Sequence, residues 1–591
     1  MKEFLKFTLA TVVGIILTGV VFFLLSIVVI TGIIAGAETE TKVPTDAVFH
    51  LYLNGVVEER VEQNPIGEFF GAKGTTIGLE DVVKSIKKAK DHEDIKGIYI
   101  EAGNMTASYA SLQAIRRELV AFKKTGKFII AYGGNYSQNA YYLASVADKV
   151  YLNPMGNIAW HGLATEIFFA KDLLKKVGIQ MQVFKVGTYK SAVEPFTETQ
   201  MSEANREQNT VLLQSIWQQV LADVSTARNL PKDSLNAYAD QNLDYASAKT
   251  YVEKGLADQL LYQDQVLEEL KKQVDIEEDE TLHTLTLNEM IYVGGSNTPK
   301  GKHGNLIAVY YATGSITDAP SPNAYETGGI NAEDMTLDLR RLREDENIHA
   351  VVLRINSPGG SAYASEQIWR EIELLKKKKP VIVSMGDVAA SGGYYIACGA
   401  NKIFAESTTI TGSIGVFGMI PDGSELLTEK LDIHFDQVKT NTLSDMGTMS
   451  RPMNEAERAL IQRSIEDVYG LFTKRCADGR KLPIEKILEV AEGRVWSGVK
   501  AKELGLVDQI GGLDDAIAAA AKAAKIEEYT LVSSPALKTP FATFFDQEKE
   551  RYISSEVSSY LGEYAPQFFY LKELKNANRI QARMPFFITF R

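Results

Sequence analysis

Cysteine is scarce in this chain of 591 residues, and no pattern that would mark a metal site occurs. The two cysteines, Cys398 and Cys476, are too few to form a disulfide framework in a protein of this size. None of the seven histidines lies in an HExxH motif or at the Cys/His spacing of zinc ligands. We therefore expect no metal and no cofactor, and we expect Cys398, which lies in an apolar stretch, to be a small core residue.

An excess of positive charge is also missing. The formal net charge is -13 at pH 7, and no long basic run occurs. The lysines at 376–379 lie where a helix is expected to end, a position that favours cations. Because nucleic acids are bound through a basic surface, nucleic acid is not an expected partner.

One long apolar run stands near the N-terminus. No charged residue occurs from Phe7 to Ala37, and this run exceeds the roughly 20 residues that cross a bilayer. We predict a transmembrane helix here. The alternative is a cleaved signal peptide ending at Ala35-Gly36-Ala37, although the run is longer than the roughly 7–15 apolar residues of such peptides.

The charges beside this run predict its orientation. Lys2 and Lys6 precede it, and Glu38 and Glu40 follow it. By the positive-inside rule, the N-terminus lies in the cytoplasm and the rest of the chain lies on the far side of the membrane.

The remainder of the chain contains an internal duplication. The segment FIIAYGGNYSQNAYYLASVADKVY, from Phe128, aligns without a gap with VIVSMGDVAASGGYYIACGANKIF, from Val381. Matches continue upstream at the same offset, and downstream, as at Ile179 and Ile433, after one inserted residue. With 45% hydrophobic residues, the chain has enough apolar material for two packed cores.

Each half alternates strands and helices, which is typical of a mainly parallel α/β fold. In the second half, AVVLRI from Ala350 predicts a strand, and SAYASEQIWREIELLKKKK from Ser361 predicts a helix that Pro380 ends. PVIVSM predicts the next strand, followed by a turn at Gly386 and a helix in SGGYYIACGA.

These patterns predict five segments. The linker is placed in GGSNTPKGKHGN, which is rich in glycine and polar residues, and the C-terminal tail has no counterpart in the first half. The predicted segments are an anchor at 1–40, a first repeat at 45–293, a linker at 294–305, a second repeat at 306–535 and a tail of unknown role at 536–591.

Ser391 is the candidate nucleophile. It follows a predicted strand and turn, begins a predicted helix, and precedes Gly392 and Gly393, which would let a substrate carbonyl approach the backbone. A second glycine turn, SPGG at 357–360, follows another strand of the same half. Two such turns could supply two oxyanion donors, or both could be ordinary strand-to-helix turns.

Lys190 is the candidate base. His349 precedes a strand and His434 lies in the strand-like LDIHFDQV, so we expect both histidines to be structural. Lys190, in KVGTYKSAVEPF, follows a strand and lies among apolar and hydroxyl residues. A lysine is a base only when neutral, which requires burial to lower its pKa; in a loop it is otherwise a solvated charge.

The two halves have kept complementary residues. In the alignment of the repeats, Ser391 matches Gln138, and Lys190 matches Ser444. Each half thus lacks what the other half has. This pattern predicts one active site, assembled either from both halves of one chain or across adjacent subunits.

The motifs GTYKSAVEPF, VAASGGYY, NSPGG and TGSIGVFG together resemble the signal peptide peptidase A family in its long, duplicated, membrane-anchored form. The resemblance covers about residues 45–535 and the anchor. It implies two tandem Clp/crotonase-like domains and a serine endopeptidase that degrades hydrophobic signal peptides left in the membrane after secretion. It further implies a homotetramer in the bacterial inner membrane with its catalytic domains on the periplasmic side.

The resemblance also implies roles for individual residues. Ser391 is the nucleophile and Lys190 the general base, and Ser413 of TGSIG is the hydroxyl that orients the lysine. The oxyanion hole is formed by the N–H groups of Gly360 and Gly392, with Gly359 as the alternative to Gly360.

Two other functions stay open at this point. A crotonase-like acyl-CoA enzyme would share the oxyanion architecture, but it would be cytoplasmic and would need no serine nucleophile. A catalytically inactive membrane-anchored scaffold would need neither residue of the pair, and the presence of both Ser391 and Lys190 opposes it.

Overall fold

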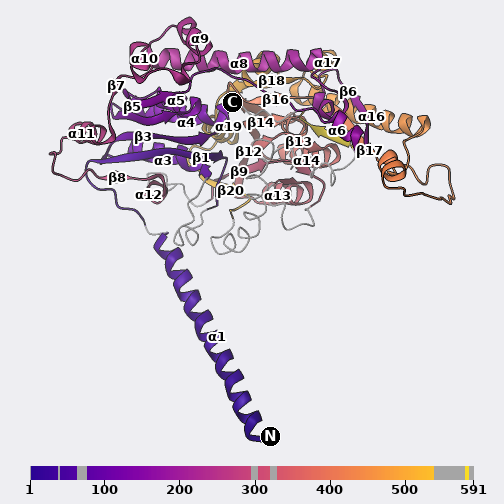
Figure 1. Ribbon diagram of the computed structural model, residues 1–591, viewed down its shortest axis with the longest axis horizontal. Coiled ribbons are helices and arrows are strands. Elements are labelled where there is room, and N and C mark those ends of the chain that lie inside the picture. Colours follow the sequence, from indigo (N-terminus) through magenta and orange to yellow (C-terminus); the bar gives the residue numbers. More distant parts are fainter. Residues whose placement is uncertain are drawn as a thin grey trace.

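The computed structural model describes residues 2–37, 40–62, 76–294, 304–319, 329–537 and 580–584. Most of the predicted linker and tail lie outside these ranges, so the predicted domain boundaries stay predictions. Helix α1 (Lys2–Ala37) extends away from a body that contains the other elements (Figure 1). Over the described residues, which leave out the side chains at 23–37, no helix is both long enough and apolar enough to cross a membrane.

The first repeat forms a seven-stranded sheet of parallel pairs. The strand order is β2-β1-β3-β4-β5-β7, and β8 pairs with β1. Central strands of a parallel sheet are covered on both faces, which is why runs such as GIYI and FIIA are apolar. The strands are β1 (Ala47–Glu58), β2 (Thr76–Gly78), β3 (Ile95–Thr106), β4 (Phe128–Tyr136), β5 (Lys149–Ile158), β7 (Gln259–Leu260) and β8 (Thr284–Leu285).

The second repeat forms an eight-stranded sheet. The order is β18-β16-β14-β12-β9-β20, and β15 pairs with β14 and β19; the pair of β16 and β18 is antiparallel and the others are parallel. The strands are β9 (Leu306–Thr313), β12 (Ile348–Ser357), β14 (Val381–Ala390), β15 (Lys402–Ala405), β16 (Ile410–Gly412), β18 (Val495–Ser497), β19 (Gln509–Ile510) and β20 (Thr530–Ser534).

The two sheets repeat one topology. The neighbours β1-β3-β4-β5-β7 of the first sheet recur as β9-β12-β14-β15-β19 in the second. The α/β fold and the duplication predicted from the sequence are therefore confirmed. The predicted strand at 350–355 lies within β12, and the predicted helix after it is α14 (Ala362–Lys376).

The prediction of a turn at Gly386 is wrong. β14 continues to Ala390, and its register against β12 shifts between Ile355 and Ser357. The Asn356 side chain accepts a hydrogen bond from the Val388 N–H at 3.1 Å, which satisfies backbone that the shifted register leaves unpaired. The strand thus extends to the residue before Ser391.

A third sheet joins the two repeats. Its order is β11-β10-β13-β21-β17-β6, with strands β6 (Gln180–Val186), β10 (Ile316–Thr317), β11 (Ile330–Asn331), β13 (Gly359–Ser361), β17 (Val416–Asp422) and β21 (Ile580–Arg583). β6 comes from the first repeat and pairs antiparallel with β17 of the second over its whole length. This pairing carries the residues after β6 onto the second repeat.

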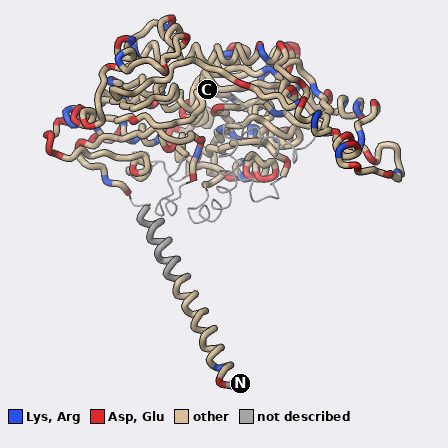
Figure 2. The backbone as a smooth tube through the Cα atoms, in the orientation of Figure 1, with Lys and Arg blue, Asp and Glu red and all other residues tan. Residues whose placement is uncertain are grey.

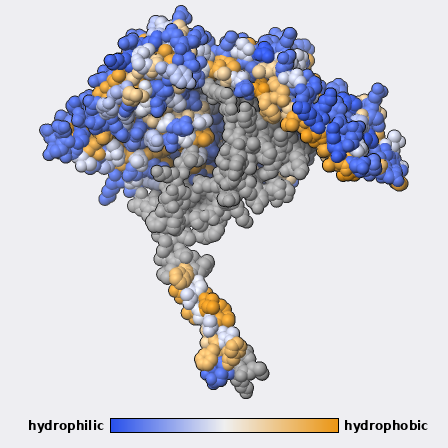
Figure 3. Space-filling view, viewed as in Figure 1, coloured by the Kyte–Doolittle hydropathy of each residue, from blue (hydrophilic) through white to orange (hydrophobic). Residues whose placement is uncertain are grey.

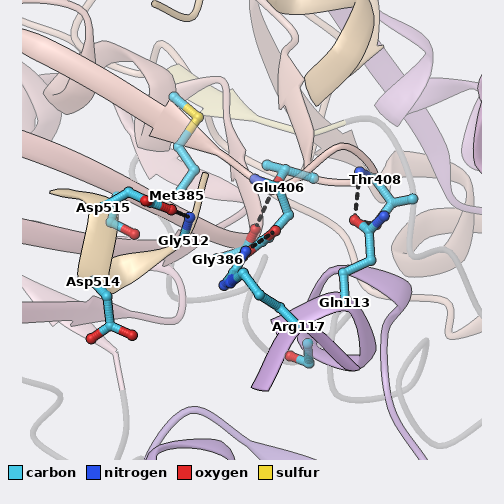
Figure 4. A network of polar contacts seen from close by, with 12 residues as sticks. Gln113, Arg117, Met385, Gly386, Glu406, Thr408, Gly512, Asp514 and Asp515 are labelled. Carbon is cyan, nitrogen blue, oxygen red and sulfur yellow. Dashed lines mark hydrogen bonds and ion pairs between the residues drawn. The ribbon is translucent and has the colours of Figure 1, made fainter. Parts of the chain in front are cut away.

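Helix α4 (Tyr109–Lys123) of the first repeat also contacts the second repeat (Figure 4). Arg117 donates two hydrogen bonds to the buried carboxylate of Glu406, at 3.0 and 2.8 Å. The Gln113 side chain accepts hydrogen bonds from the backbone N–H and the hydroxyl of Thr408, at 3.1 and 2.8 Å. Both contacts fix the orientation of one repeat on the other.

A buried ion pair lies between the repeats. Arg354 of β12 donates to both carboxylate oxygens of Glu59, at 2.6 and 3.1 Å, and their side chains are 4% and 6% exposed. The same guanidinium donates to the Ser384 hydroxyl and the Met385 carbonyl. Elsewhere, acidic and basic residues are intermixed over the described part of the body (Figure 2).

This ion pair predicts a stability effect. Replacing Arg354 with Met leaves the Glu59 carboxylate buried without its partner, and such losses cost about 3–5 kcal/mol. We expect the Arg354→Met variant to unfold at a temperature several degrees lower than the parent chain, measured by circular dichroism. The control is the double variant Arg354→Met/Glu59→Leu, which removes both charges and should recover most of the loss. Equal destabilisation in both variants would contradict the role of the pair.

Candidate active site

Ser391 lies between the end of β14 and helix α15 (Gly392–Ala397), in a strained backbone conformation. Its φ is 55° and its ψ is -114°, a region that costs a non-glycine residue about 1–3 kcal/mol. The Ser391 N–H donates to the Gly412 carbonyl at 2.8 Å, and its carbonyl accepts from the Tyr395 N–H at 2.8 Å. These bonds hold the backbone of Ser391 in place at the end of β14.

Lys190 reaches this hydroxyl from the first repeat. Its Nζ lies 2.8 Å from Ser391 Oγ, 3.0 Å from Ser413 Oγ and 3.1 Å from the Ser413 carbonyl oxygen. All three residues are fully buried. The structure thus brings Ser391, Lys190 and Ser413 together inside one chain, which is one of the two arrangements that the sequence left open.

Burial controls the protonation of the lysine. Loss of hydration lowers the pKa of Lys190 well below its ordinary value. A neutral amine has two N–H groups and one lone pair. The Ser413 carbonyl oxygen can accept a hydrogen bond from one N–H of the amine, and it cannot donate. If the Ser413 hydroxyl oxygen accepts the other N–H, the lone pair of the amine can accept a hydrogen bond from the Ser391 hydroxyl. This arrangement suits transfer of the Ser391 proton to Lys190.

A turn of the second repeat holds the backbone of Lys190. The Tyr189 N–H donates to the Glu492 carbonyl at 2.9 Å, and Gly493 follows with a φ of 75°. A Cβ at Gly493 would lie 2.7 Å from the Lys190 Cβ, so only glycine permits this approach. The lysine is therefore placed by contacts from both repeats.

Helix α8 (Glu203–Arg228) adds a buried polar network behind Lys190. The Gln208 amide donates to the Tyr189 carbonyl at 3.0 Å and to the Ser191 hydroxyl at 2.9 Å. The Ser191 hydroxyl donates to Asn205 Oδ1 at 2.9 Å. Sequence reasoning missed Asn205 and Gln208; the only available signal was two amides three residues apart, on one face of a helix.

The two glycine turns meet beside Ser391. Gly359 has a φ of 95°, and a Cβ there would lie 2.6 Å from the Gly392 nitrogen. The Gly359 N–H donates to the Ser357 hydroxyl at 3.1 Å. Gly360 is in turn paired with Ile316 and with Ala582. The assignment of Gly360, rather than Gly359, as the oxyanion donor beside Gly392 stays a prediction.

The matching position of the first repeat has a structural residue. The Gln138 amide donates to the Tyr109 hydroxyl at 2.9 Å and the Gly162 carbonyl at 3.0 Å, and its oxygen accepts from two backbone N–H groups. Both polar groups of the Gln138 side chain are thus hydrogen-bonded within the first repeat. Ser444, which matches Lys190, lies in an exposed segment.

The remaining residues singled out in the sequence lie outside this arrangement. His349 contacts the Gly304 carbonyl, and the His434 side chain is 81% exposed beside Asp432. The strand-like pattern around His434 is misleading, because the structure has no strand in the described segment 423–454. Cys398 is buried in the core, as predicted. In the described ranges, no group of three or more metal-ligating side chains was found.

Comparison with protein families matches the two repeats separately. The peptidase family S49 matches residues 121–277 and again residues 373–527. The Clp protease family matches residues 328–411, which contain β14 and Ser391. The resemblance stated from the sequence motifs is therefore confirmed.

Relatives span most of the chain. Protease 4 of Salmonella typhi is 37% identical over 81% of this chain and 79% of its own length. The chloroplastic serine protease SPPA of Arabidopsis thaliana is 34% identical over 86% of this chain and 74% of its own length. Protease 4 of Haemophilus influenzae is 34% identical over 84% of this chain and 82% of its own length. The chain belongs to peptidase family S49: it is a serine protease with a mixed α/β, Clp-protease-like fold in which the S49 unit is duplicated.

Proposed function

We propose that this protein is a membrane-anchored endopeptidase in which Ser391 and Lys190 form a catalytic dyad that degrades signal peptides left in the membrane after secretion. The observation that carries the dyad is the 2.8 Å contact between Lys190 Nζ and Ser391 Oγ. A buried lysine that served only the fold would be expected to pair with a carboxylate. The recorded partners of the Lys190 amine are instead two hydroxyls and a carbonyl.

The proposed mechanism has two stages. Neutral Lys190 takes the proton of the Ser391 hydroxyl while the oxygen attacks a peptide carbonyl carbon, and the N–H groups of Gly360 and Gly392 stabilise the oxyanion. Lys190 then gives the proton to the leaving amine, and the acyl-enzyme forms. In the second stage Lys190 takes a proton from the water that attacks the ester carbonyl carbon, and it then gives that proton to Ser391 Oγ as the ester bond breaks and the carboxylic acid product leaves. Ser413 keeps the amine aimed at Ser391.

The other two candidate functions lose support. Membership in a peptidase family opposes both the acyl-CoA enzyme and the inactive scaffold. The strained conformation of Ser391 opposes them too, because neither function needs a serine held at φ 55° against a buried amine.

Helix α1 supports a membrane location. After Lys6 its described side chains carry no charge and many are apolar (Figure 3), and Phe7, Ile16 and Phe22 are 61–68% exposed. Such surfaces are costly in water and favourable in lipid. Together with the flanking charges and the family, this supports an anchor in the bacterial inner membrane, with the N-terminus in the cytoplasm, the body on the periplasmic side, and hydrophobic peptides as substrates.

The duplication supports a homo-oligomer. By the alignment, β6 corresponds to residues 434–440, and β17 corresponds to a segment within residues 162–169. β6 and β17 pair with each other, yet both of their counterparts lack strand structure. Residues 431–440, here called the arm, lie on a projection of the body (Figure 1), with Phe435 50% and Val438 101% exposed.

We propose that the arm of one copy pairs with residues 162–169 of the next copy, as β6 pairs with β17 within the chain. This contact is head-to-tail, and head-to-tail contacts form rings when the rotation between copies closes. A ring is compatible with the homotetramer that the family resemblance implies.

The dyad predicts the effect of two substitutions. We expect Ser391→Ala and Lys190→Met to lower peptidase activity by roughly 10³-fold or more, because each removes a group needed for acyl transfer. Activity is measured on a fluorogenic peptide with the full chain in detergent. Ser413→Ala should lower kcat by a smaller factor, because it only orients Lys190. Covalent labelling of Ser391 by an acylating serine-protease probe is the direct check; substantial activity in either of the first two variants would disprove the dyad.

Burial of Lys190 predicts a pH dependence. Its pKa is lowered, so the amine is protonated and inactive below that lowered value and neutral above it. We expect kcat/KM to fall as pH decreases through this value and to be level above it. The Lys190→Met variant should also be more thermostable than the parent near neutral pH, because burying a lysine costs stability at every pH below its ordinary pKa. Activity that rises only near the ordinary pKa of lysine would contradict the proposal.

The arm predicts an effect on assembly. We expect the double variant Phe435→Asp/Val438→Asp to shift the protein toward monomer, because charges oppose burial of the arm against a second copy. The measurement is sedimentation velocity in detergent. The control is Leu267→Asp, which changes an exposed residue of α11 (Gln263–Gln273) outside the arm and should leave the assembly unchanged. An unchanged assembly in the double variant would rule out the arm contact.

A further inference from the structure

A segment of the C-terminal tail lies across the active site. Strand β21 lies between β13 and β17 and is antiparallel to both. Gly360 is in register with Ala582, and Phe417 is in register with Gln581. Since adjacent strands lie about 4.8 Å apart, β13 and β17 are separated by a slot about 10 Å across, which a single extended chain fills.

The Ala582 carbonyl lies at the glycine turns. A Cβ at Gly359 would lie 2.2 Å from the Ala582 oxygen, and a Cβ at Gly392 would lie 3.0 Å from it. Next to it, the Met584 N–H donates to the Pro358 carbonyl at 2.7 Å, which fixes the register of the segment. One backbone carbonyl of the tail thus lies between the two glycine turns that flank Ser391.

We propose that residues 580–584 are a built-in pseudo-substrate that competes with peptide substrates for the slot between β13 and β17. The proposal rests on the proposed peptidase function. It also states what the slot accepts: one chain in extended conformation, bonded on both sides by its backbone, with a small residue at the place of Ala582.

Burial supports the limit on side-chain size. Ala582 is fully buried, and its neighbours Gln581 and Arg583 are 5% exposed. A helix is about 10–12 Å across with its side chains and is too wide for a slot of one strand. A signal peptide that was helical in the bilayer would therefore have to unwind before it could bind.

Competition by the tail follows from its attachment. A segment tethered to the same chain acts at an effective concentration that free peptides reach only at high dose. Residues 580–584 therefore limit access to Ser391 until a substrate displaces them, and weakening their strand should activate the enzyme.

The test uses two substitutions that weaken β21 in different ways. Ala582→Trp is too large for the buried position, and Ala582→Pro removes a backbone N–H without adding bulk. We expect both full-length variants to raise kcat/KM on an extended fluorogenic peptide about tenfold or more. The matched control is Leu537→Trp, an exposed residue before the described tail segment, which should leave kcat/KM unchanged.

A peptide added in trans sharpens the test. The peptide RIQARM, the sequence of residues 579–584, should inhibit the Ala582→Trp variant competitively, and the same peptide with its alanine changed to tryptophan should not. If neither tail variant is activated while the acylating probe still labels Ser391, the pseudo-substrate is disproved and the peptidase function stands. If Ser391 is not labelled in any variant and no peptide is cleaved, the peptidase function itself fails.

Discussion

The catalytic arrangement depends on one backbone contact, the antiparallel pairing of β6 with β17. β6 belongs to the first repeat and β17 to the second, and Lys190 follows β6 by only four residues. Without this pairing the lysine has no fixed relation to Ser391, which is 201 residues away in sequence. Strand pairing supplies this precision, because its register admits only discrete positions.

Other contacts between the repeats help to fix the register of β6 against β17. The buried pair of Arg354 and Glu59 and the bidentate pair of Arg117 and Glu406 both cross the boundary between the repeats. Buried charge pairs contribute little net stability, but breaking one is costly, so they oppose sliding of one repeat on the other. These contacts thus join the two repeats to each other.

Burial of Lys190 lowers the stability of the fold, and it also makes the amine able to act as a base. An amine in a dry interior weakens the fold and becomes a base for the same reason, namely loss of hydration. The polar network of Gln208, Ser191 and Asn205 offsets part of this cost, because it satisfies the backbone and hydroxyl groups around the lysine. The third sheet bears on the proposed peptide binding, because β13 and β17, the strands that hold β21 between them, have their edges beside Ser391.

The sequence by itself determined the features that repeat or depend on neighbouring residues. Periodic apolar runs predicted the α/β elements, the alignment of the halves revealed the duplication, and the motifs around Ser391 and Lys190 indicated a peptidase family. Predictions from local sequence patterns were wrong where the local structure depends on residues that are distant in sequence. The turn expected at Gly386 is a register shift stabilised by Asn356. The strand-like segment around His434 pairs with no strand in the part of the chain that the structure describes.

Only the tertiary structure decided that both members of the pair meet within one chain, and that Gln208 and Gly493 place the lysine. Only the tertiary structure placed residues 580–584 in the slot beside Ser391. The physical reason is the same in each case. Strand pairing, burial and pKa depend on groups that folding brings together from distant parts of the chain, and no local pattern encodes which distant groups will meet.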